Sequence, residues 1–299
     1  MKKLIYLFLA LLIVACSDDS SDNGNNDSGG GNEQSLCEEI GLIYLDTNGV
    51  TIKACEDAIL GDTGVVNGIT YTVVDEAMLR EMFANGEDLT KVVTTFVTDM
   101  SSLFFLDEDI PNDFNQDISS WDVSNVTDMS FMFTSSVFNQ DIGNWDVSSV
   151  NDMHQMFSNC FWFNQPIGNW DVSYVFDMRA MFGGATAFNQ PIGDWDVSNV
   201  TSMSSMFRGS GYFNQDISSW DVSRVFYMTS MFEGSTFNKD ISSWDISGTY
   251  DMAYMFLNAE YYNQDISSWD TSYVRDCLRF SENTPRWTLP KPNFTNCIP

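Results

Sequence analysis

The chain has 299 residues, of which 42 are acidic and 13 are lysine or arginine, and its formal net charge at pH 7 is −29. A field of this sign repels nucleic acid and anionic lipid headgroups, so the charge excludes both as partners. It is compatible with a divalent cation or a basic partner, and equally with a surface that only keeps the protein soluble.

The first 15 residues predict a secretory signal peptide. Two lysines, Lys2 and Lys3, precede an apolar run over residues 4–14 that is too short to span a membrane. The run ends at Ala15 and Cys16, the small residue and cysteine of a lipoprotein cleavage site. We therefore expect Cys16 to carry the lipid that anchors the chain to a bacterial membrane. Ordinary secretion without lipidation is the alternative.

A polar segment over residues 16–35 follows the cysteine. It is rich in Ser, Asp, Asn and Gly and contains no aromatic residue. Such a composition cannot bury a core, so the segment is predicted to be a disordered tether. The acidic pair Asp18 and Asp19 favours transfer to the outer membrane with the protein facing the cell exterior.

Two hairpins and a helix are predicted over residues 36–88. The stretches "LIYLDTNGVTIKA" and "GVVNGITYTVV" each place an Asn-Gly turn between β-forming runs. Asp75 then precedes "EAMLREMFA" and is expected to cap a short helix. We expect these residues to form a small α+β N-terminal cap on the structure that follows.

From residue 89 to residue 276 the chain repeats a unit of about 25 residues, which is typical of a solenoid. Ile118, Trp121 and Val123 have the L-x-x-L-x-L spacing of a leucine-rich repeat and predict a short strand with inward side chains. Met129 and Met132 follow at helical spacing and predict a short helical or 3₁₀ segment. The repeated tryptophans are Trp121, Trp145, Trp170, Trp195, Trp220, Trp244 and Trp269.

The predicted fold class is therefore a leucine-rich-repeat-like solenoid, in which each coil buries its apolar face against its neighbours. "TFVTDMSSLF" over residues 95–104 resembles the later units and indicates an entry half-repeat. Residues 277–299 are expected to form the C-terminal cap. The five cysteines left after Cys16 allow two disulfides, Cys37 with Cys55 and Cys277 with Cys297, although spacing alone does not settle the connectivity.

Two polar columns recur with the tryptophans. One is a column of asparagines, from Asn115 to Asn263, whose amides are expected to hydrogen-bond along the solenoid axis. The other is the aspartate after each tryptophan, from Asp122 to Asp270. Each of these carboxylates is expected to accept N–H groups of the following turn, while a row of Ca²⁺ sites is the alternative. No cofactor and no metal is expected.

The chain offers little catalytic chemistry. Its only histidine is His154, and the matching positions in other coils hold Ser130, Arg179, Ser204, Thr229 and Ala253. This variation predicts a column that faces water. We therefore do not expect a Ser-His-Asp or Cys-His site, and we do not expect an enzyme.

The variable positions indicate where recognition takes place. Aromatic and arginine side chains replace Asn, Thr and Asp in the later coils, and such side chains are enriched at protein interfaces. Packing against neighbouring coils is the alternative. The first candidate set is Tyr174, Phe176, Arg224, Phe226, Tyr227, Tyr250, Tyr273 and Arg275, and the second is Trp162, Tyr212 and Tyr261.

The units, with "FNQDISSWDVSNVTDMSFMF" foremost and a W-D-x-S-x-V-x-x-M-x-x-M-F core, resemble the repeat of BspA-like leucine-rich-repeat surface lipoproteins. The similarity covers residues 90–276, with Gly248 and Thr249 in place of the usual pair and Thr271 in place of Val. It implies a non-catalytic surface protein that adheres to an extracellular or neighbouring-cell protein, with membrane contact only through the lipid. Binding of a glycan by the exposed aromatics is the alternative.

Overall fold

A computed structural model describes residues 41–106 and 112–299. The predicted signal peptide, the predicted lipidation site Cys16, the predicted tether and Cys37 lie outside the described residues. The elements in chain order are β1 (Ile43–Leu45), β2 (Ile52–Ala54), β3 (Thr63–Val66), β4 (Ile69–Val73), α2 (Glu76–Ala84), the 3₁₀ helix η1 (Leu89–Lys91) and β5 (Val92–Val93).

The predicted hairpins and helix cap are confirmed. Strands β1 and β2 are antiparallel, as are β3 and β4. The turn between β3 and β4 places Asn67 and Gly68 at φ angles of 52° and 82°, the left-handed pair that a two-residue hairpin turn requires. The side chain of Asp75 accepts a hydrogen bond of 2.8 Å from the backbone N–H of Met78, which begins α2.

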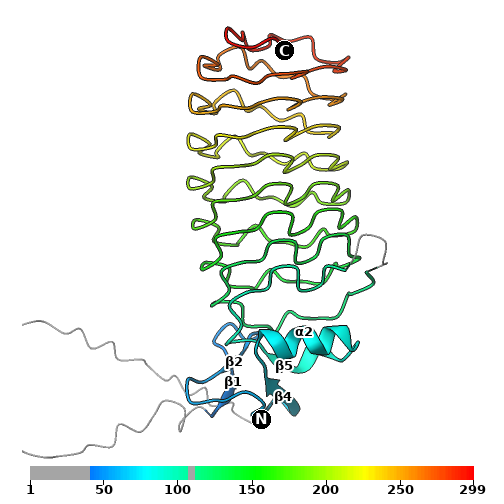
Figure 1. Cartoon of the computed structure of the whole chain (residues 1–299), viewed down its shortest axis with the longest axis vertical. Helices are drawn as coiled ribbons and strands as arrows, with labels where there is room; N and C mark the ends of the chain where they lie inside the picture. Colours follow the sequence, from blue (N-terminus) through cyan, green and yellow to red (C-terminus); the bar gives the residue numbers. More distant parts are fainter. Residues whose placement is uncertain (1–40, 107–111) are drawn as a thin grey trace, which may run out of the picture. The chain divides into compact units, whose positions relative to one another are not determined.

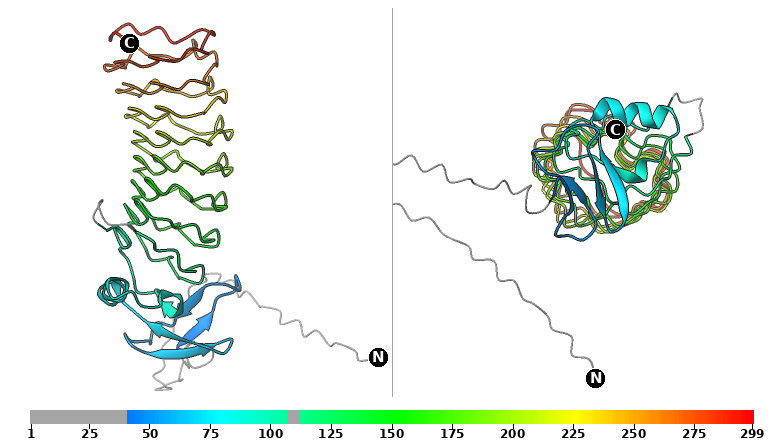
Figure 2. Two further views of the ribbon diagram at one scale, coloured as in Figure 1. Left: turned by 90° about the vertical axis from the view of Figure 1, so that its right-hand side faces the viewer. Right: turned by 90° about the horizontal axis from the view of Figure 1, so that it is seen from below.

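The strands form two sheets, β1-β2 and β3-β4-β5. Together with helix α2 they lie at one end of the repeated coils (Figure 2). The Phe83 ring meets the rings of Phe104 and Phe114 edge-on, with centroids 5.1 and 5.8 Å away. Arg80 donates a hydrogen bond of 2.9 Å to the carbonyl of Ser101. Strand β5, which the sequence placed in the repeat, pairs in parallel with β4. The sheet β3-β4-β5 and the first coil therefore share the segment around residue 92.

The repeat forms coils that stack one upon the next along the chain (Figure 1). One residue of each coil forms a parallel β-bridge to the same position in the next coil. The bridges are single residues and do not extend into strands. Residues about 25 positions apart are therefore neighbours all along the stack. The bridged positions are Asp99, Asp128, Asp152, Asp177, Ser202, Tyr227, Asp251 and Asp276.

The local structure of the coils differs from the prediction, because neither the strand at Ile118–Val123 nor the helical segment at Met129–Met132 is formed. Both are chains of tight turns, as shown by the hydrogen bonds from the Trp121 N–H to the Ile118 carbonyl (3.1 Å) and from the Met132 N–H to the Met129 carbonyl (3.2 Å). A β-turn places residues i and i+3 on one side, as a helix does, so the apolar spacing is the same for both.

Each coil also contains a non-glycine residue in the left-handed region. These residues have φ between 50° and 59° and are Phe131, Gln155, Ala180, Ser205, Ser230, Tyr254 and Arg279. The conformation costs an L-residue about 1–2 kcal/mol. The left-handed conformation lets alternate N–H groups point at the following coil. The N–H groups of Met129, Phe131 and Phe133 donate hydrogen bonds of 2.9–3.0 Å to that coil, and the acceptors are the carbonyls of Asp152, His154 and Met156, respectively. Inter-coil hydrogen bonds thus stabilise a backbone that is locally unfavourable.

Aromatic rings form the interior of the stack. All seven repeat tryptophans are at most 5% exposed, which confirms the inward prediction for this column. The indole N–H of Trp195 donates to the Ile167 carbonyl of the preceding coil at 3.1 Å, and the other repeat tryptophans make the equivalent bond. Phenylalanines stack beside them, as Phe182 does on Phe188 with centroids 3.9 Å apart.

The asparagine column is part of the scaffold. The Asn189 side-chain oxygen accepts the backbone N–H of Asn214 at 3.0 Å and the side-chain amide of Gln215 at 3.0 Å, both from the next coil. Equivalent Asn-to-Asn bonds join the column from Asn115 to Asn263. The amide column therefore runs along the stack as the sequence predicted.

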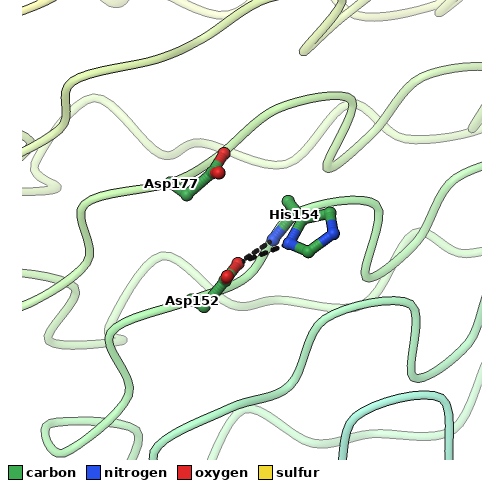
Figure 3. A group of neighbouring side chains, drawn as sticks. All are labelled: Asp152, His154 and Asp177. Atoms are coloured by element: carbon green, nitrogen blue, oxygen red, sulfur yellow. Dashed lines mark hydrogen bonds and ion pairs between the residues drawn. The ribbon is translucent and has the colours of Figure 1, made fainter.

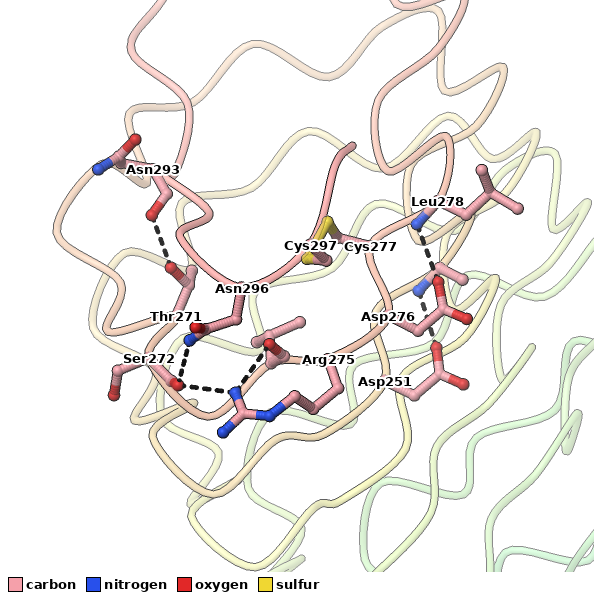
Figure 4. The surroundings of a disulfide bond; sticks show 12 residues. Asp251, Thr271, Ser272, Arg275, Asp276, Cys277, Leu278, Asn293, Asn296 and Cys297 are labelled. Atoms are coloured by element: carbon pink, nitrogen blue, oxygen red, sulfur yellow. Dashed lines mark hydrogen bonds between the residues drawn. A yellow bond between two sulfur atoms is a disulfide. The ribbon is translucent and has the colours of Figure 1, made fainter.

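The end of the chain covers the last coil. Trp287 occupies the phenylalanine column, is 6% exposed, and donates its indole N–H to the Gln264 carbonyl at 3.0 Å. Cys277 and Cys297 form a disulfide, and Asn296 donates to the Ser272 carbonyl beside it (Figure 4). Cys55 is disulfide-bonded as well. Cys160 is a buried free thiol, and burial raises its pKa to about 12.

Candidate ligand-binding surface

The first candidate set is exposed, and we name it the aromatic stripe. Tyr174 is 71% exposed, and the other five aromatic members are 44–49% exposed. The two arginines, Arg224 and Arg275, are exposed as well. Exposed rings on four different coils are unusual for a soluble surface and are typical of a binding face. The aromatic members are Tyr174, Phe176, Phe226, Tyr227, Tyr250 and Tyr273.

Backbone hydrogen bonds between coils hold the stripe in place. The Phe226 N–H donates to the Thr201 carbonyl of the preceding coil at 2.9 Å, and the Phe226 carbonyl accepts the Tyr250 N–H of the next coil at 2.9 Å. Phe176 is held in the same way through Asn151 and Thr201. These side chains therefore project from a backbone that is already hydrogen-bonded between coils.

Side chains of the stripe also contact one another. Tyr250 and Tyr273, from successive coils, form an edge-to-face pair with centroids 6.2 Å apart. The Arg275 guanidinium lies 5.6 Å from the centroid of the Tyr273 ring. Arg224 donates to the side-chain oxygen of Asn199 at 2.7 Å. The stripe is thus a continuous surface from Tyr250 to Arg275.

A hollow interrupts the stripe at the coil that contains Thr201. Small polar residues replace the rings there, and the hollow is lined by Asp177, Arg179, Thr201, Ser202, Ser204 and Tyr227. Arg179 forms an ion pair with Asp177, with an N–O distance of 2.6 Å. The hollow therefore presents hydroxyls and a carboxylate–guanidinium pair between the exposed rings of Phe176 and Phe226.

A row of ionised carboxylates lies near the stripe. Asp196 accepts the backbone N–H of Ser198 at 3.0 Å, and Asp221 and Asp245 make the matching bond two residues on. The serine hydroxyl and backbone N–H lower the pKa of each, although the neighbouring aspartates raise it by a smaller amount. The turn-capping interpretation thus accounts for the row, and the charge of Arg224 also lowers the pKa of Asp221.

The second candidate set is exposed but more dispersed. Trp162, Tyr212 and Tyr261 are 65%, 67% and 44% exposed, and each lies two coils from the next. Arg286 stacks over the Tyr261 ring at 4.4 Å. Phe161, which the sequence reasoning missed, is 52% exposed beside Trp162. Among the described residues no ring contact joins this set to the stripe.

The prediction that the His154 column faces water is confirmed only at Arg179, whose side chain is 53% exposed. Ser130 and Ala253 are buried, and the His154 side chain is only 19% exposed. His154 Nδ1 lies 2.7 Å from Asp152 Oδ1, and the ring meets Phe131 edge-on at 4.5 Å. Asp177 of the next coil completes a group whose ligand atoms all lie within 4.8 Å of one another (Figure 3). Within the described part of the chain, this is the group with metal-ligand geometry.

A groove lined by small residues was not predicted. Its floor includes Gly184, Gly209 and Gly234, whose φ angles of 71°, 66° and 65° explain the glycines. The ion pair of Arg208 and Glu233 also lines the groove, and the volume of the groove is about 510 Å³. The glycine spacing could have indicated it, because Cβ atoms are absent at one position of three successive coils.

The described residues, 41–106 and 112–299, include no helix with the length and apolarity needed to cross a bilayer.

Comparison with known proteins gave one family. No curated protein and no solved structure matches the chain. The model of one family matches residues 76–194 and again residues 185–288, which together cover α2, β5 and the stack of coils and amount to more than half of the chain. The two matches overlap at residues 185–194, within one coil, as expected for a model that spans several repeats. The chain thus belongs to the family described as Mycoplasma protein of unknown function, DUF285.

Proposed function

We propose that the chain is a non-catalytic, lipid-anchored surface protein that binds an extracellular or neighbouring-cell protein through the aromatic stripe. In this proposal the stack of coils is a leucine-rich-repeat-like solenoid of the BspA-like kind, and Cys16 is the lipid attachment site on the outer membrane. The solenoid is the rigid support, and the variable side chains on it meet the partner.

The observation that carries the proposal is the contrast within single coils. In the coil that begins near Ile217, Trp220 is 3% exposed and matches every other coil, whereas Phe226 and Tyr227 are 44% and 49% exposed and occupy positions that vary from coil to coil. Exposed rings cost free energy in water without a partner. Rings that pack against an interface centre contribute more than about 1 kcal/mol each when they are desolvated.

The test is a capture experiment with two matched triple variants. One variant carries Tyr174→Ser, Phe226→Ser and Tyr250→Ser in the stripe, and the other carries Trp162→Ser, Tyr212→Ser and Tyr261→Ser in the second set. We expect the stripe variant to lose capture of an extracellular protein partner and the second variant to keep it. The reverse result would transfer the proposed site to the second set.

Anchoring is tested separately. Cys16→Ser should shift the protein from the membrane fraction to the soluble fraction, because no lipid is then attached. An equally membrane-bound variant would contradict the lipoprotein proposal while leaving the binding proposal intact.

The hollow supports a second candidate, the capture of a glycan. Sugar rings stack on aromatic faces and their hydroxyls pair with carboxylates and guanidinium groups, and the hollow offers Asp177, Arg179, Ser204 and Tyr227 together. Thr201→Phe discriminates the two candidates, because it fills the hollow and extends the stripe from Phe176 to Phe226. A glycan array should lose its signal with this variant, whereas capture of a protein should be unchanged or stronger.

A further inference from the structure

The group formed by Asp152, His154 and Asp177 arises from the stacking of two coils. Asp152 and Asp177 are bridge partners in successive coils, so the stack brings two carboxylates together from positions 25 residues apart. The His154 backbone N–H and Nδ1 both approach Asp152 Oδ1, at 2.9 and 2.7 Å. Asp152 and His154 side chains are 19% exposed and Asp177 is 11% exposed. The three ligands are therefore partly shielded from water and positioned by backbone bonds.

Protein cations balance only part of the charge of the group. Arg179 binds Asp177 through Nε at 2.8 Å and through its terminal nitrogen at 2.6 Å. Among the described residues no arginine or lysine forms an ion pair with Asp152, although the charge of Arg179 interacts with it, and the side-chain contact of Asp152 is with His154. The two carboxylates outnumber the one guanidinium at this partly buried position, where an unpaired charge is unfavourable. A bound cation would remove that charge.

The donor set selects the kind of cation. One imidazole nitrogen and two carboxylates suit Zn²⁺, whereas Ca²⁺ and Mg²⁺ take oxygen ligands. Donors around tetrahedral Zn²⁺ lie roughly 3.3 Å apart, so a contraction of the group is needed. Arg179 can swing away to permit it, because its side chain is 53% exposed.

From this geometry we propose that Asp152, His154 and Asp177 form a binding site for one Zn²⁺ ion, with water in the fourth position. The site does not depend on the proposed binding of a protein or a glycan. A bound ion would link two successive coils beside the hollow.

Other coils provide internal controls. Asp251 and Asp276 are also bridge partners, and the Ala253 N–H donates to Asp251 at 2.9 Å as the His154 N–H does to Asp152. That coil pair lacks the imidazole, and Leu278 takes the place of Arg179. It should therefore not bind Zn²⁺, so one site per chain is expected.

Isothermal titration of the full chain with Zn²⁺, in excess Ca²⁺ to saturate carboxylate-only positions, tests the proposal. We expect one equivalent of Zn²⁺ to bind. His154→Ala should weaken binding at least tenfold, and Arg179→Ala should retain or tighten it because the competing cation is removed. Absence of Zn²⁺ binding, or equal affinity in a folded His154→Ala variant, would overturn the proposal.

A gain of binding gives a second test. Ala253→His supplies the missing imidazole between Asp251 and Asp276, so the stoichiometry should rise from one to two. Thermal unfolding establishes that the variant is folded. A folded variant that still binds one equivalent would show that this arrangement of ligands does not hold the metal, and would also overturn the proposal.

Discussion

The buried columns and the aromatic stripe use the same residue types for opposite purposes. Trp195 is 3% exposed and donates a hydrogen bond to the preceding coil, while Trp162 is 65% exposed and its indole makes no such bond within the described part of the chain. The difference is the position within the coil, not the chemistry of the side chain. Positions that face the interior have similar surroundings in every coil and keep one residue in most coils, whereas positions on the outside do not have this constraint.

The largest expected effect is in the tryptophan column. Trp195→Ala should lower the free energy of unfolding by about 3–5 kcal/mol, because it opens a cavity and leaves the Ile167 carbonyl without its donor. Trp162→Ala is the matched control and should change it by less than about 0.5 kcal/mol. Urea denaturation measures both. Equal midpoints for the two variants would contradict the division into buried and exposed columns.

The C-terminal disulfide should have the next largest effect. Cys277→Ser together with Cys297→Ser removes a crosslink between residues 20 positions apart. Removing a native disulfide that closes a loop of this size lowers the free energy of unfolding by about 2–4 kcal/mol. The stack should then fray from its last coil, which hydrogen exchange detects as lost protection near Trp269 before loss near Trp145. Uniform loss along the stack would indicate that this end does not act as a cap.

A smaller, stabilising effect is expected at Tyr262. This tyrosine occupies the phenylalanine column, and its buried hydroxyl has no hydrogen-bond partner among the described residues. Tyr262→Phe should raise the free energy of unfolding by about 1 kcal/mol, since the cost of burying an unpaired hydroxyl is removed. The matched control, Phe237→Tyr in the preceding coil, should lower it. Thermal unfolding measures both variants. A lower melting temperature for Tyr262→Phe than for the parent chain would contradict the prediction.

The smallest effect on stability is expected in the stripe. The triple change Tyr174→Ser, Phe226→Ser and Tyr250→Ser should move the melting temperature by no more than a few degrees, because these side chains are 44–71% exposed. A large drop would mean that the rings pack against neighbouring coils and are part of the scaffold. This measurement accompanies the capture experiment, so that lost binding is not confused with lost folding.

The sequence by itself determined much of the architecture. Identical residues at a period of about 25 predicted the stacked units and the inward tryptophans, since a repeated environment selects a repeated side chain. Local signals were sufficient for the N-terminal element, where an Asn-Gly pair or a capping aspartate acts on its immediate neighbours. Exposure of the stripe followed from its variability, because Asn, Thr and Gly hold the same positions elsewhere.

Only the tertiary structure decided the rest. Apolar residues at i and i+3 are compatible with both a helix and a chain of β-turns. The coils form turns because hydrogen bonds between coils stabilise residues in the left-handed region, such as Phe131 and Gln155. The hollow and the Asp152–His154–Asp177 group combine side chains of different coils. Their proximity depends on the register between coils, which hydrogen bonds between residues about 25 positions apart establish and which no local pattern encodes.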